Sequence, residues 1–301
     1  MTSRWGVPFL GVCLVAGLAC GNHQNELAEI TRSKTAVARE VRLEKALTDH
    51  NAALAARPLA QWIMPAPLKE ISGLALTKDG RMLTHGDETG EIWEVDYRRG
   101  ILVKHFFLGE NSVKGDFEGI TIVNDVIFLL ASNGKIYEFH EGANNAHVKY
   151  DIIETGLKAA CEFEGIAYDP TINSLLMACK HIHDKNVHDA LVLYRLGLAN
   201  DSTSRLSMLT VPIADILKAN GWKSFHPSDI TIDSETGNYV LISSLEKGMV
   251  EVTPAGDVVF ARPLPEGHQQ AEGIAITKDS ILVVSDEAKQ GPGLITLYKW
   301  P

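Results

Sequence analysis

One seven-residue motif recurs along this chain and constrains its fold more than any other feature of the sequence. The clearest copies span residues 116–122, 162–168 and 270–276, and each has Glu-Gly-Ile at its centre. Weaker copies span residues 70–76 and 226–232. The fourth residues of the copies are Gly73, Gly119, Gly165, Asp229 and Gly273, which are 46, 46, 64 and 44 residues apart. Near-constant periods of this length are typical of solenoids and propellers.

Each motif is predicted to form the first strand of a four-stranded unit. A turn rich in Asp, Gly, Pro and Ser follows it, then an apolar strand, a strand of alternating character and a less regular fourth strand. Repeated four-stranded antiparallel units are the blades of a β-propeller, so the sequence predicts an all-β fold. Counting motifs gives five blades. A sixth, divergent blade is the alternative, because the third unit is long and contains a helix-like stretch at residues 212–221.

The fifth unit has no fourth strand of its own before residue 301. Residues 60–67 resemble residues 259–265, which belong to the fourth strand of the preceding unit. We therefore expect residues 61–64 to pair with the strand that contains residues 295–298, so that an N-terminal strand closes the ring. Closure removes the open sheet edges that an unclosed array would expose.

The first 58 residues differ in character from the repeats. Arg4 and an apolar run over residues 5–19 are typical of a signal peptide, and the run is short for a membrane span. Cys20 follows Gly-Leu-Ala, which resembles the lipidation site of bacterial lipoproteins; an ordinary secretory signal cleaved near residue 19 is the alternative. We divide the chain into a lipoprotein-like signal peptide (1–19), a helical stalk or linker (20–58) and the propeller (59–301). If residues 20–58 form a free stalk, removal of residues 1–51 should leave the stability of the propeller nearly unchanged.

These features predict a bacterial cell-envelope protein, held in the membrane by a lipid on Cys20 and facing the periplasm. Gly21 slightly favours the outer membrane, because lipoproteins kept at the inner membrane tend to carry Asp at that position. The formal charge of −10 argues against nucleic acid or anionic lipid as a partner of the folded body. The same charge is compatible with a cation or a basic ligand.

Five carboxylates are expected to gather at one mouth of the central channel. Glu118, Glu164 and Glu272 each directly precede a first strand, while Asp87 and Asp286 follow second strands. Clustered carboxylates must gain protons or a cation, because mutual repulsion disfavours ionising them all. Ca²⁺ prefers oxygen ligands of this kind, so these five residues are the predicted metal ligands. Alternatively, the glutamates accept backbone N–H bonds from a neighbouring blade.

Three further polar residues are candidate ligand-binding residues at the same mouth. His181 lies in a polar loop over residues 180–189 that has a His-x-His pattern but no second metal-ligand spacing. His226 and Ser228 occupy the weaker copy of the motif at residues 226–232, and His226 stands in the repeat position that Asp116 and Glu162 occupy in two other copies. An exposed polar loop at the channel mouth explains the His-rich stretch better than a transition-metal site.

Two cysteines of the propeller region are expected to form a disulfide. Cys161 begins the first strand of the third unit and Cys179 ends the second strand, with a turn about midway between them. Antiparallel pairing can bring their Cα atoms within the roughly 4.4–6.8 Å that a disulfide needs. A register slip of one residue would turn the two side chains to opposite faces of the sheet.

The five motifs, the His-Pro-Ser-Asp-Ile variant at residues 226–230 and Ser-Asp-Glu at residues 285–287 resemble the SdiA-regulated family of bacterial β-propellers. The resemblance covers about residues 60–301, and Glu-Gly-Ile-Ala also recurs in phytase-like esterase propellers. It implies a cell-envelope location and a bound calcium ion. It implies no particular reaction, and no catalytic residue is carried over.

Two functions follow as hypotheses. The first is a membrane-anchored binding propeller that holds Ca²⁺ at its channel mouth and recognises a small molecule, an envelope polymer or a protein. The alternative is a Ca²⁺-assisted phytase-like or esterase-like hydrolase, in which His181 or His226 serves as general base. The sequence contains no recognisable nucleophile motif, which favours the first.

Overall fold

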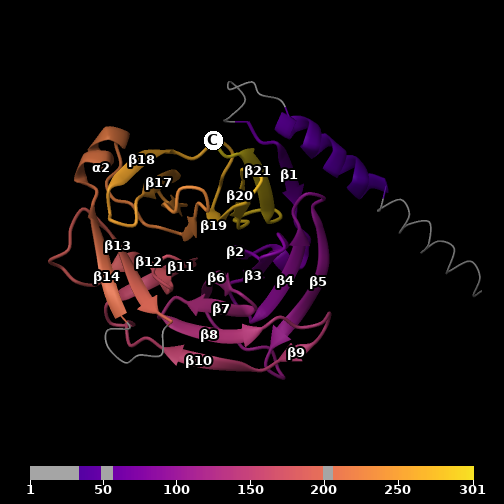
Figure 1. Ribbon diagram of the computed structural model, residues 1–301, viewed down its shortest axis with the longest axis horizontal. Helices are drawn as coiled ribbons and strands as arrows, with labels where there is room; N and C mark the ends of the chain where they lie inside the picture. The colour runs from indigo at the N-terminus through magenta and orange to yellow at the C-terminus, as the bar shows by residue number, and fades with distance from the viewer. Residues whose placement is uncertain (1–33, 49–56, 199–205) are drawn as a thin grey trace, which may run out of the picture.

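The predicted five-bladed β-propeller is confirmed in the computed structural model, which describes residues 34–48, 57–198 and 206–301. Five antiparallel sheets surround one axis, and the first strand of each repeat lies nearest to that axis (Figure 1). The long third unit is a single blade. Its additional residues form the loop after β12 (Ser174–Ile182) and the short helix α2 (Ala214–Asn220), which ends at Gly221 in the left-handed conformation. The described residues therefore form five blades and not six.

The blades follow one another in chain order. The first contains β2 (Ile71–Leu76), β3 (Met82–Gly86), β4 (Glu91–Asp96) and β5 (Ile101–Leu108). The second contains β6 (Phe117–Val123), β7 (Val126–Ala131), β8 (Lys135–His140) and β10 (Tyr150–Glu154). The third contains β11 (Cys161–Asp169), β12 (Ser174–Ile182), β13 (Ala190–Gly197) and β14 (Leu206–Pro212). The fourth contains β15 (Asp229–Ile232), β16 (Tyr239–Ser243), β17 (Gly248–Val252) and β18 (Val258–Pro263). The fifth contains β19 (Ala271–Ile276), β20 (Ile281–Asp286), β21 (Leu294–Lys299) and β1 (Ala60–Ile63), and a 3₁₀ turn, η2 (Ala66–Leu68), follows β1.

The fourth strand expected in the second unit is divided between two blades. Its first part, β9 (His147–Val148), pairs in parallel with β5 of the first blade, and only β10 joins the second blade. As a result, backbone N–H groups on the outer edge of β5 gain hydrogen-bond partners. Phe107 N–H donates to Ala146 C=O at 2.9 Å, and Gly109 N–H donates to Val148 C=O at 2.8 Å.

The N-terminal strand closes the ring, as the sequence predicts. In β1, Gln61 lies opposite Thr296 and Trp62 lies opposite Ile295 of β21. The indole N–H of Trp62 donates to the Tyr97 carbonyl at 2.6 Å, which ties this strand to the first blade as well. The strand therefore joins the last blade to the first.

Close approach at the axis explains why glycine recurs in the motif. A Cβ added to Gly119 would lie 2.7 Å from the Cα of Gly165, and one added to Gly165 would lie 2.6 Å from the Cα of Asp229. No side chain fits at those distances, so the innermost strands pack backbone against backbone. The fourth blade carries Asp229 instead, which is buried and accepts the N–H of Ile274 at 2.8 Å.

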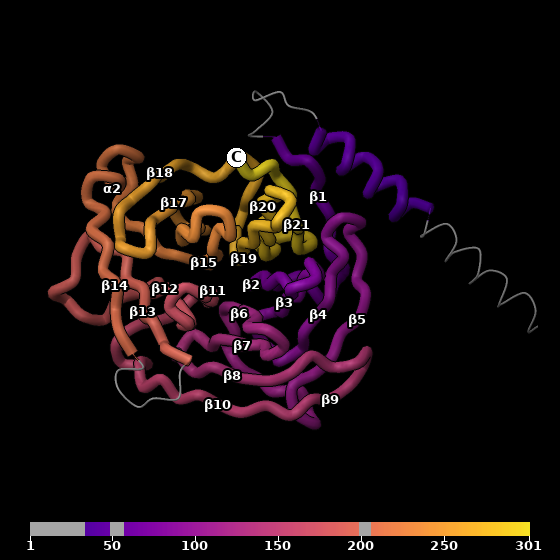
Figure 2. The backbone as a smooth tube through the Cα atoms, in the orientation of Figure 1, coloured from indigo at the N-terminus to yellow at the C-terminus, as the bar shows by residue number. Residues whose placement is uncertain are grey.

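The helix over residues 34–48 packs on the outside of the ring beside β1 (Figure 2). Leu43 is buried in the core between the first and fifth blades. The Arg39 guanidinium lies 5.1 Å from the centre of the Trp62 ring, and Glu40 pairs with Arg99 at 2.9 Å. This helix is therefore docked and is not a free stalk. Among the described residues, no helix is long and apolar enough to cross a membrane.

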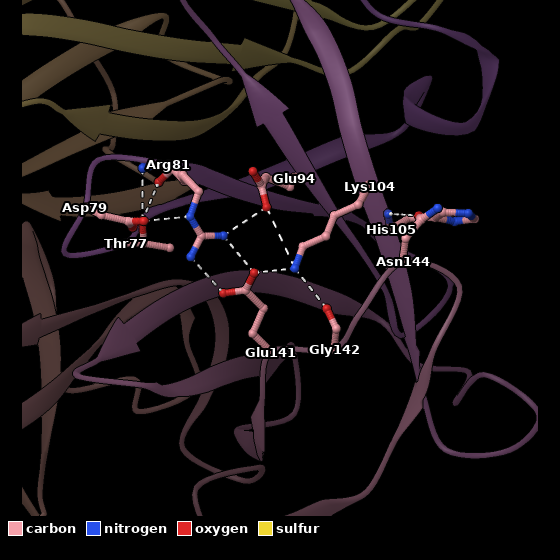
Figure 3. A network of polar contacts seen from close by, with 9 residues as sticks. All are labelled: Thr77, Asp79, Arg81, Glu94, Lys104, His105, Glu141, Gly142 and Asn144. Carbon is pink, nitrogen blue, oxygen red and sulfur yellow. Dashed lines mark hydrogen bonds and ion pairs between the residues drawn. The ribbon is translucent and has the colours of Figure 1, made fainter.

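A network of ion pairs joins the first blade to the second (Figure 3). It lies beside the first residue of β3, at the opposite end of that strand from the predicted mouth. Arg81 donates to both oxygens of Glu141, at 2.7 and 3.0 Å, and to Glu94 at 2.9 Å. Lys104 contacts the same Glu141 carboxylate and donates to the Gly142 carbonyl at 2.9 Å. Because two blades share these charges, the network fixes their relative position.

Candidate functional site

The first strands begin and the second strands end at the same mouth of the channel, as predicted. Phe117 N–H donates to the carbonyl of Asp87 at 2.7 Å, and Phe163 N–H donates to the carbonyl of Ser132 at 2.9 Å. Side chains from the two sets also meet, since Ser132 donates to Asp116 at 2.5 Å. The two backbone contacts link neighbouring blades, and the side-chain contact joins the two inner strands of the second blade, so that polar termini gather at the mouth.

The structure brings the three motif glutamates together from β6, β11 and β19. Burial, followed by repulsion from Glu164, raises the pKa of Glu118 to about 9. Burial raises the pKa of Glu164 to about 8, with Glu272 adding repulsion, and burial raises the pKa of Glu272 to about 7. Glu164 is only 4% exposed. The mouth therefore holds carboxyl groups that retain protons near neutral pH.

Lys180 supplies the positive charge among these carboxyls. Its ammonium pairs with Glu164, and the charges of Glu164, Glu272 and Glu118 raise its pKa although burial opposes them. A bulge in β12 positions it: Glu162 lies opposite His181 and Phe163 lies opposite Cys179, which leaves Lys180 without a cross-strand partner. Bulges commonly redirect a side chain in this way. The sequence indicates that Lys180 follows the apolar part of a second strand. It does not reveal the bulge that directs the Lys180 side chain toward the carboxyl groups.

The glutamates are not backbone caps, which was the alternative interpretation of the motif. In the described part of the chain, no backbone N–H donates to Glu118, Glu164 or Glu272. Asp229, by contrast, does cap the backbone, because its side chain accepts the N–H of Ile274 at 2.8 Å. Ser228, at the position equivalent to the glutamates, donates to the Ala271 carbonyl at 2.6 Å. The fold accepts serine at this position, so the glutamates are not required for architecture.

The two aspartates that were predicted to lie at the mouth, Asp87 and Asp286, occupy different environments. Asp87 lies at the mouth, where burial and then Glu70 raise its pKa, and it also raises the pKa of Glu287. Asp286 is buried and accepts a hydrogen bond from His268 at 2.6 Å. The register explains the difference: Asp286 pairs with Ala271 inside β20, whereas Asp87 follows the last paired residue of β3. Adjacent residues point to opposite faces, so Glu287 and not Asp286 is the counterpart of Asp87.

His181 and His226 meet at one side of the mouth, with ring centres 4.9 Å apart. Burial lowers the pKa of His181. His226 contacts Glu246, a residue that sequence reasoning missed because it lies beyond the end of β16 and belongs to no motif. Ser228 is buried against the backbone of the fifth blade and faces no ligand space.

Cys161 and Cys179 are joined by a disulfide, with their Cα atoms 5.8 Å apart. They are not direct cross-strand partners, because Cys161 lies opposite Ile182 and Cys179 lies opposite Phe163. The bulge at Lys180 shifts the register by one residue, which brings both sulfur atoms to the same side of the hairpin. One irregularity thus positions both the disulfide and the ammonium group.

The mouth as arranged does not fit a bound calcium ion. Within residues 34–48, 57–198 and 206–301, no three His, Cys, Asp or Glu side chains are grouped so that they could hold a metal. The oxygen donors suit a hard cation, but the Lys180 ammonium already pairs with Glu164 among them. Calcium therefore stays a prediction from the sequence.

Replacing Glu118 by Gln should change how stability depends on pH. The folded protein keeps a proton on Glu118 up to about pH 9, whereas the ordinary pKa is 4.5. The stability from that proton is complete below the ordinary pKa and is lost as the pH rises toward 9. We expect Glu118→Gln to match the wild type at pH 5 and to exceed it by at least about 1 kcal/mol at pH 9. Urea unfolding at both pH values measures this, with exposed Glu110→Gln as control, and a constant difference would contradict it.

No protein-family model matches the sequence, and no characterised protein matches it. Several solved structures share the fold. A luciferin-regenerating enzyme is 10% identical over 80% of this chain and 97% of that chain, with a TM-score of 0.51. A PQQ-bound aldose sugar dehydrogenase from Streptomyces coelicolor is 13% identical over 80% and 98%, with a TM-score of 0.53. A glutaminyl cyclase from Myxococcus xanthus is 12% identical over 80% and 94%, with a TM-score of 0.52. At such identities the likeness shows the propeller fold alone.

Proposed function

We propose that this chain is a binding propeller of the cell envelope, whose acidic channel mouth binds an organic ammonium ligand. The observation that supports this most is the meeting of three glutamates from three blades, one buried and two partly buried, around a single ammonium, that of Lys180. Titratable groups with shifted pKa values that the fold does not need are typical of functional sites.

Lys180 itself indicates the kind of cation that suits the mouth. An ammonium group offers hydrogen-bond donors as well as charge, and Glu164 already accepts such a group. The further carboxyls, Glu118, Glu272, Asp87 and Glu287, exceed the charge that one lysine can neutralise. A second ammonium can pair with them and displace their protons. The lipidation-like Cys20 supports a location at the envelope membrane, as an expectation from the sequence.

Isothermal titration of the protein with n-butylammonium chloride at pH 8 tests this proposal. We expect saturable binding, release of protons that shows as a dependence of the heat on the buffer, and no binding of uncharged 1-butanol. Glu272→Gln should weaken binding at least about tenfold, which is about 1.4 kcal/mol, because a charged partner is lost. The exposed Glu110→Gln should bind normally.

Calcium chloride forms the second arm of this titration. Binding of Ca²⁺ without binding of butylammonium would overturn the ammonium proposal in favour of the calcium site that the sequence predicts. Binding of neither cation would overturn both. Binding of butylammonium that Glu272→Gln leaves unchanged would place the ligand away from the mouth.

A further inference from the structure

A second site lies next to the acidic mouth and goes beyond the proposed binding function. A pocket of about 210 Å³ lies between the end of β12 and the insertions of the third blade. Its apolar wall includes Ile182, Ile213, Leu217 and Phe225. Its polar wall includes Lys180, His181, Ser224 and His226. The pocket thus offers an apolar surface beside an ammonium and two imidazoles.

Glu246 holds the imidazole of His226 in one orientation. Its Oε1 lies 3.0 Å from Nδ1 of His226, and its Oε2 accepts the backbone N–H of the same residue at 3.0 Å. Ser243 donates to Oε2 at 2.5 Å and Ser224 donates to Oε1 at 3.0 Å. Although burial opposes ionisation, these hydrogen bonds lower the pKa of Glu246, so its carboxylate is charged at neutral pH.

This arrangement determines what His226 can do. A carboxylate beside Nδ1 favours the tautomer with the proton on Nδ1, which leaves the lone pair on Nε2. An imidazole oriented in this way is the usual form of a general base. The charged and titratable groups nearest to it are Glu246 and His181, and Lys180, Asp189 and Lys223 line the same pocket.

The lining of the pocket limits the class of substrate. Its charged groups include the carboxylates of Asp189 and the adjoining Glu246 as well as the ammonium groups of Lys180 and Lys223, so the wall does not present the excess of positive charge that an anionic phosphate ester needs. The apolar wall instead suits an uncharged acyl group. Ser224 is a poor nucleophile here, because its hydroxyl donates to Glu246 at 3.0 Å and lies 3.2 Å from Nδ1 of His226, the nitrogen that carries the proton, and not beside the lone pair of Nε2.

We propose that this pocket hydrolyses uncharged carboxylic esters without a metal, with His226 as the catalytic general base and Glu246 as its positioning residue. Nε2 of His226 takes a proton from a water molecule while the water oxygen bonds to the ester carbonyl carbon. Lys180, which lines the same pocket, donates a hydrogen bond to the resulting oxyanion. The carbonyl re-forms, the C–O bond to the alcohol breaks, and His226 returns the proton to the leaving alkoxide. The products are a carboxylic acid and an alcohol.

Hydrolysis of 4-nitrophenyl acetate by the purified protein tests this proposal, with EDTA present throughout. We expect saturable turnover above the buffer rate, and His226→Gln should lower kcat at least about 100-fold, as general-base loss usually does. Glu246→Gln should lower kcat about 10- to 100-fold with KM unchanged, because the imidazole stays in place but loses its tautomer preference. His183→Gln is the matched control, since it removes one exposed histidine from the adjacent loop and should keep the full rate.

Several results would overturn this assignment. Equal rates for His226→Gln and His183→Gln would mean that any esterase activity comes from surface histidines. Loss of turnover in Ser224→Ala together with a burst of nitrophenol in the wild type would replace water attack by an acyl-enzyme on Ser224. No saturable turnover in the wild type would also refute it. Butylammonium binding should be unchanged in His226→Gln, so failure here is distinguishable from failure of the binding proposal.

Discussion

Deleting residues 1–67 should destabilise the propeller by at least about 5 kcal/mol, which approaches the whole stability of an ordinary domain. The deletion removes β1, the fourth strand of the fifth blade, and leaves β21 with an open edge. It also removes Met64, which is only 3% exposed, and Trp62, which ties the strand to the first blade. Loss of one buried methionine side chain alone typically costs about 2–5 kcal/mol. Urea unfolding followed by tryptophan fluorescence and circular dichroism measures the effect.

Two shorter truncations separate closure from helix docking. Deletion of residues 1–33 keeps the helix over residues 34–48 and serves as the reference. Deletion of residues 1–51 removes Leu43, which is 1% exposed, and the Glu40–Arg99 pair. It should therefore cost about 2–3 kcal/mol, and not the negligible amount that a free stalk predicts. Equal unfolding midpoints for the 1–51 and 1–67 deletions would show that β1 does not close the ring.

Lys180→Gln should produce the largest pH-dependent loss of stability of any substitution at the mouth. Above about pH 8 Glu164 and Glu272 lose their protons, and the Lys180 ammonium is the positive charge beside them. Removing one partner of a buried ion pair costs about 3 kcal/mol or more, and we expect this at pH 9. At pH 5 all three glutamates hold protons, so the cost should fall below about 1 kcal/mol. The Lys180 pKa is itself raised, so its charge persists at pH 9.

Urea unfolding of Lys180→Gln at pH 5 and pH 9 measures this effect, and Lys185→Gln, in the exposed loop that follows, is the matched control. Adding CaCl₂ at pH 9 should raise the melting temperature of Lys180→Gln more than that of the wild type, because an external cation replaces the missing ammonium. An equal loss of stability at the two pH values would show that Lys180 contributes by packing and not by charge.

Much of the fold is predictable from this sequence because its information is local and repeated. Gly119 and Gly165 recur where the innermost strands approach within contact distance, and only glycine permits that approach. The alternation of apolar and polar residues and the turn chemistry follow from strand geometry alone. The closing strand is also predictable, because residues 60–67 resemble the fourth strand of another unit. The gathering of Glu118, Glu164 and Glu272 follows from the ring once five equivalent positions are known.

What only the tertiary structure decides are the departures from the repeat. The bulge in β12 turns Lys180 into the carboxyl cluster, and a bulge has no signature in the residue pattern. A shift of one residue exchanges Asp286 for Glu287 at the mouth, because neighbouring side chains in a strand point to opposite faces. Glu246 reaches His226 from 20 residues away through the fold of the fourth blade. Docking of the N-terminal helix likewise depends on an apolar cluster around Leu43 that forms only once the first and fifth blades have met. The sequence by itself determines the repeating strands and the position of the mouth, since these depend on short-range patterns; the arrangement of charges inside the mouth depends on register, bulges and long-range contacts.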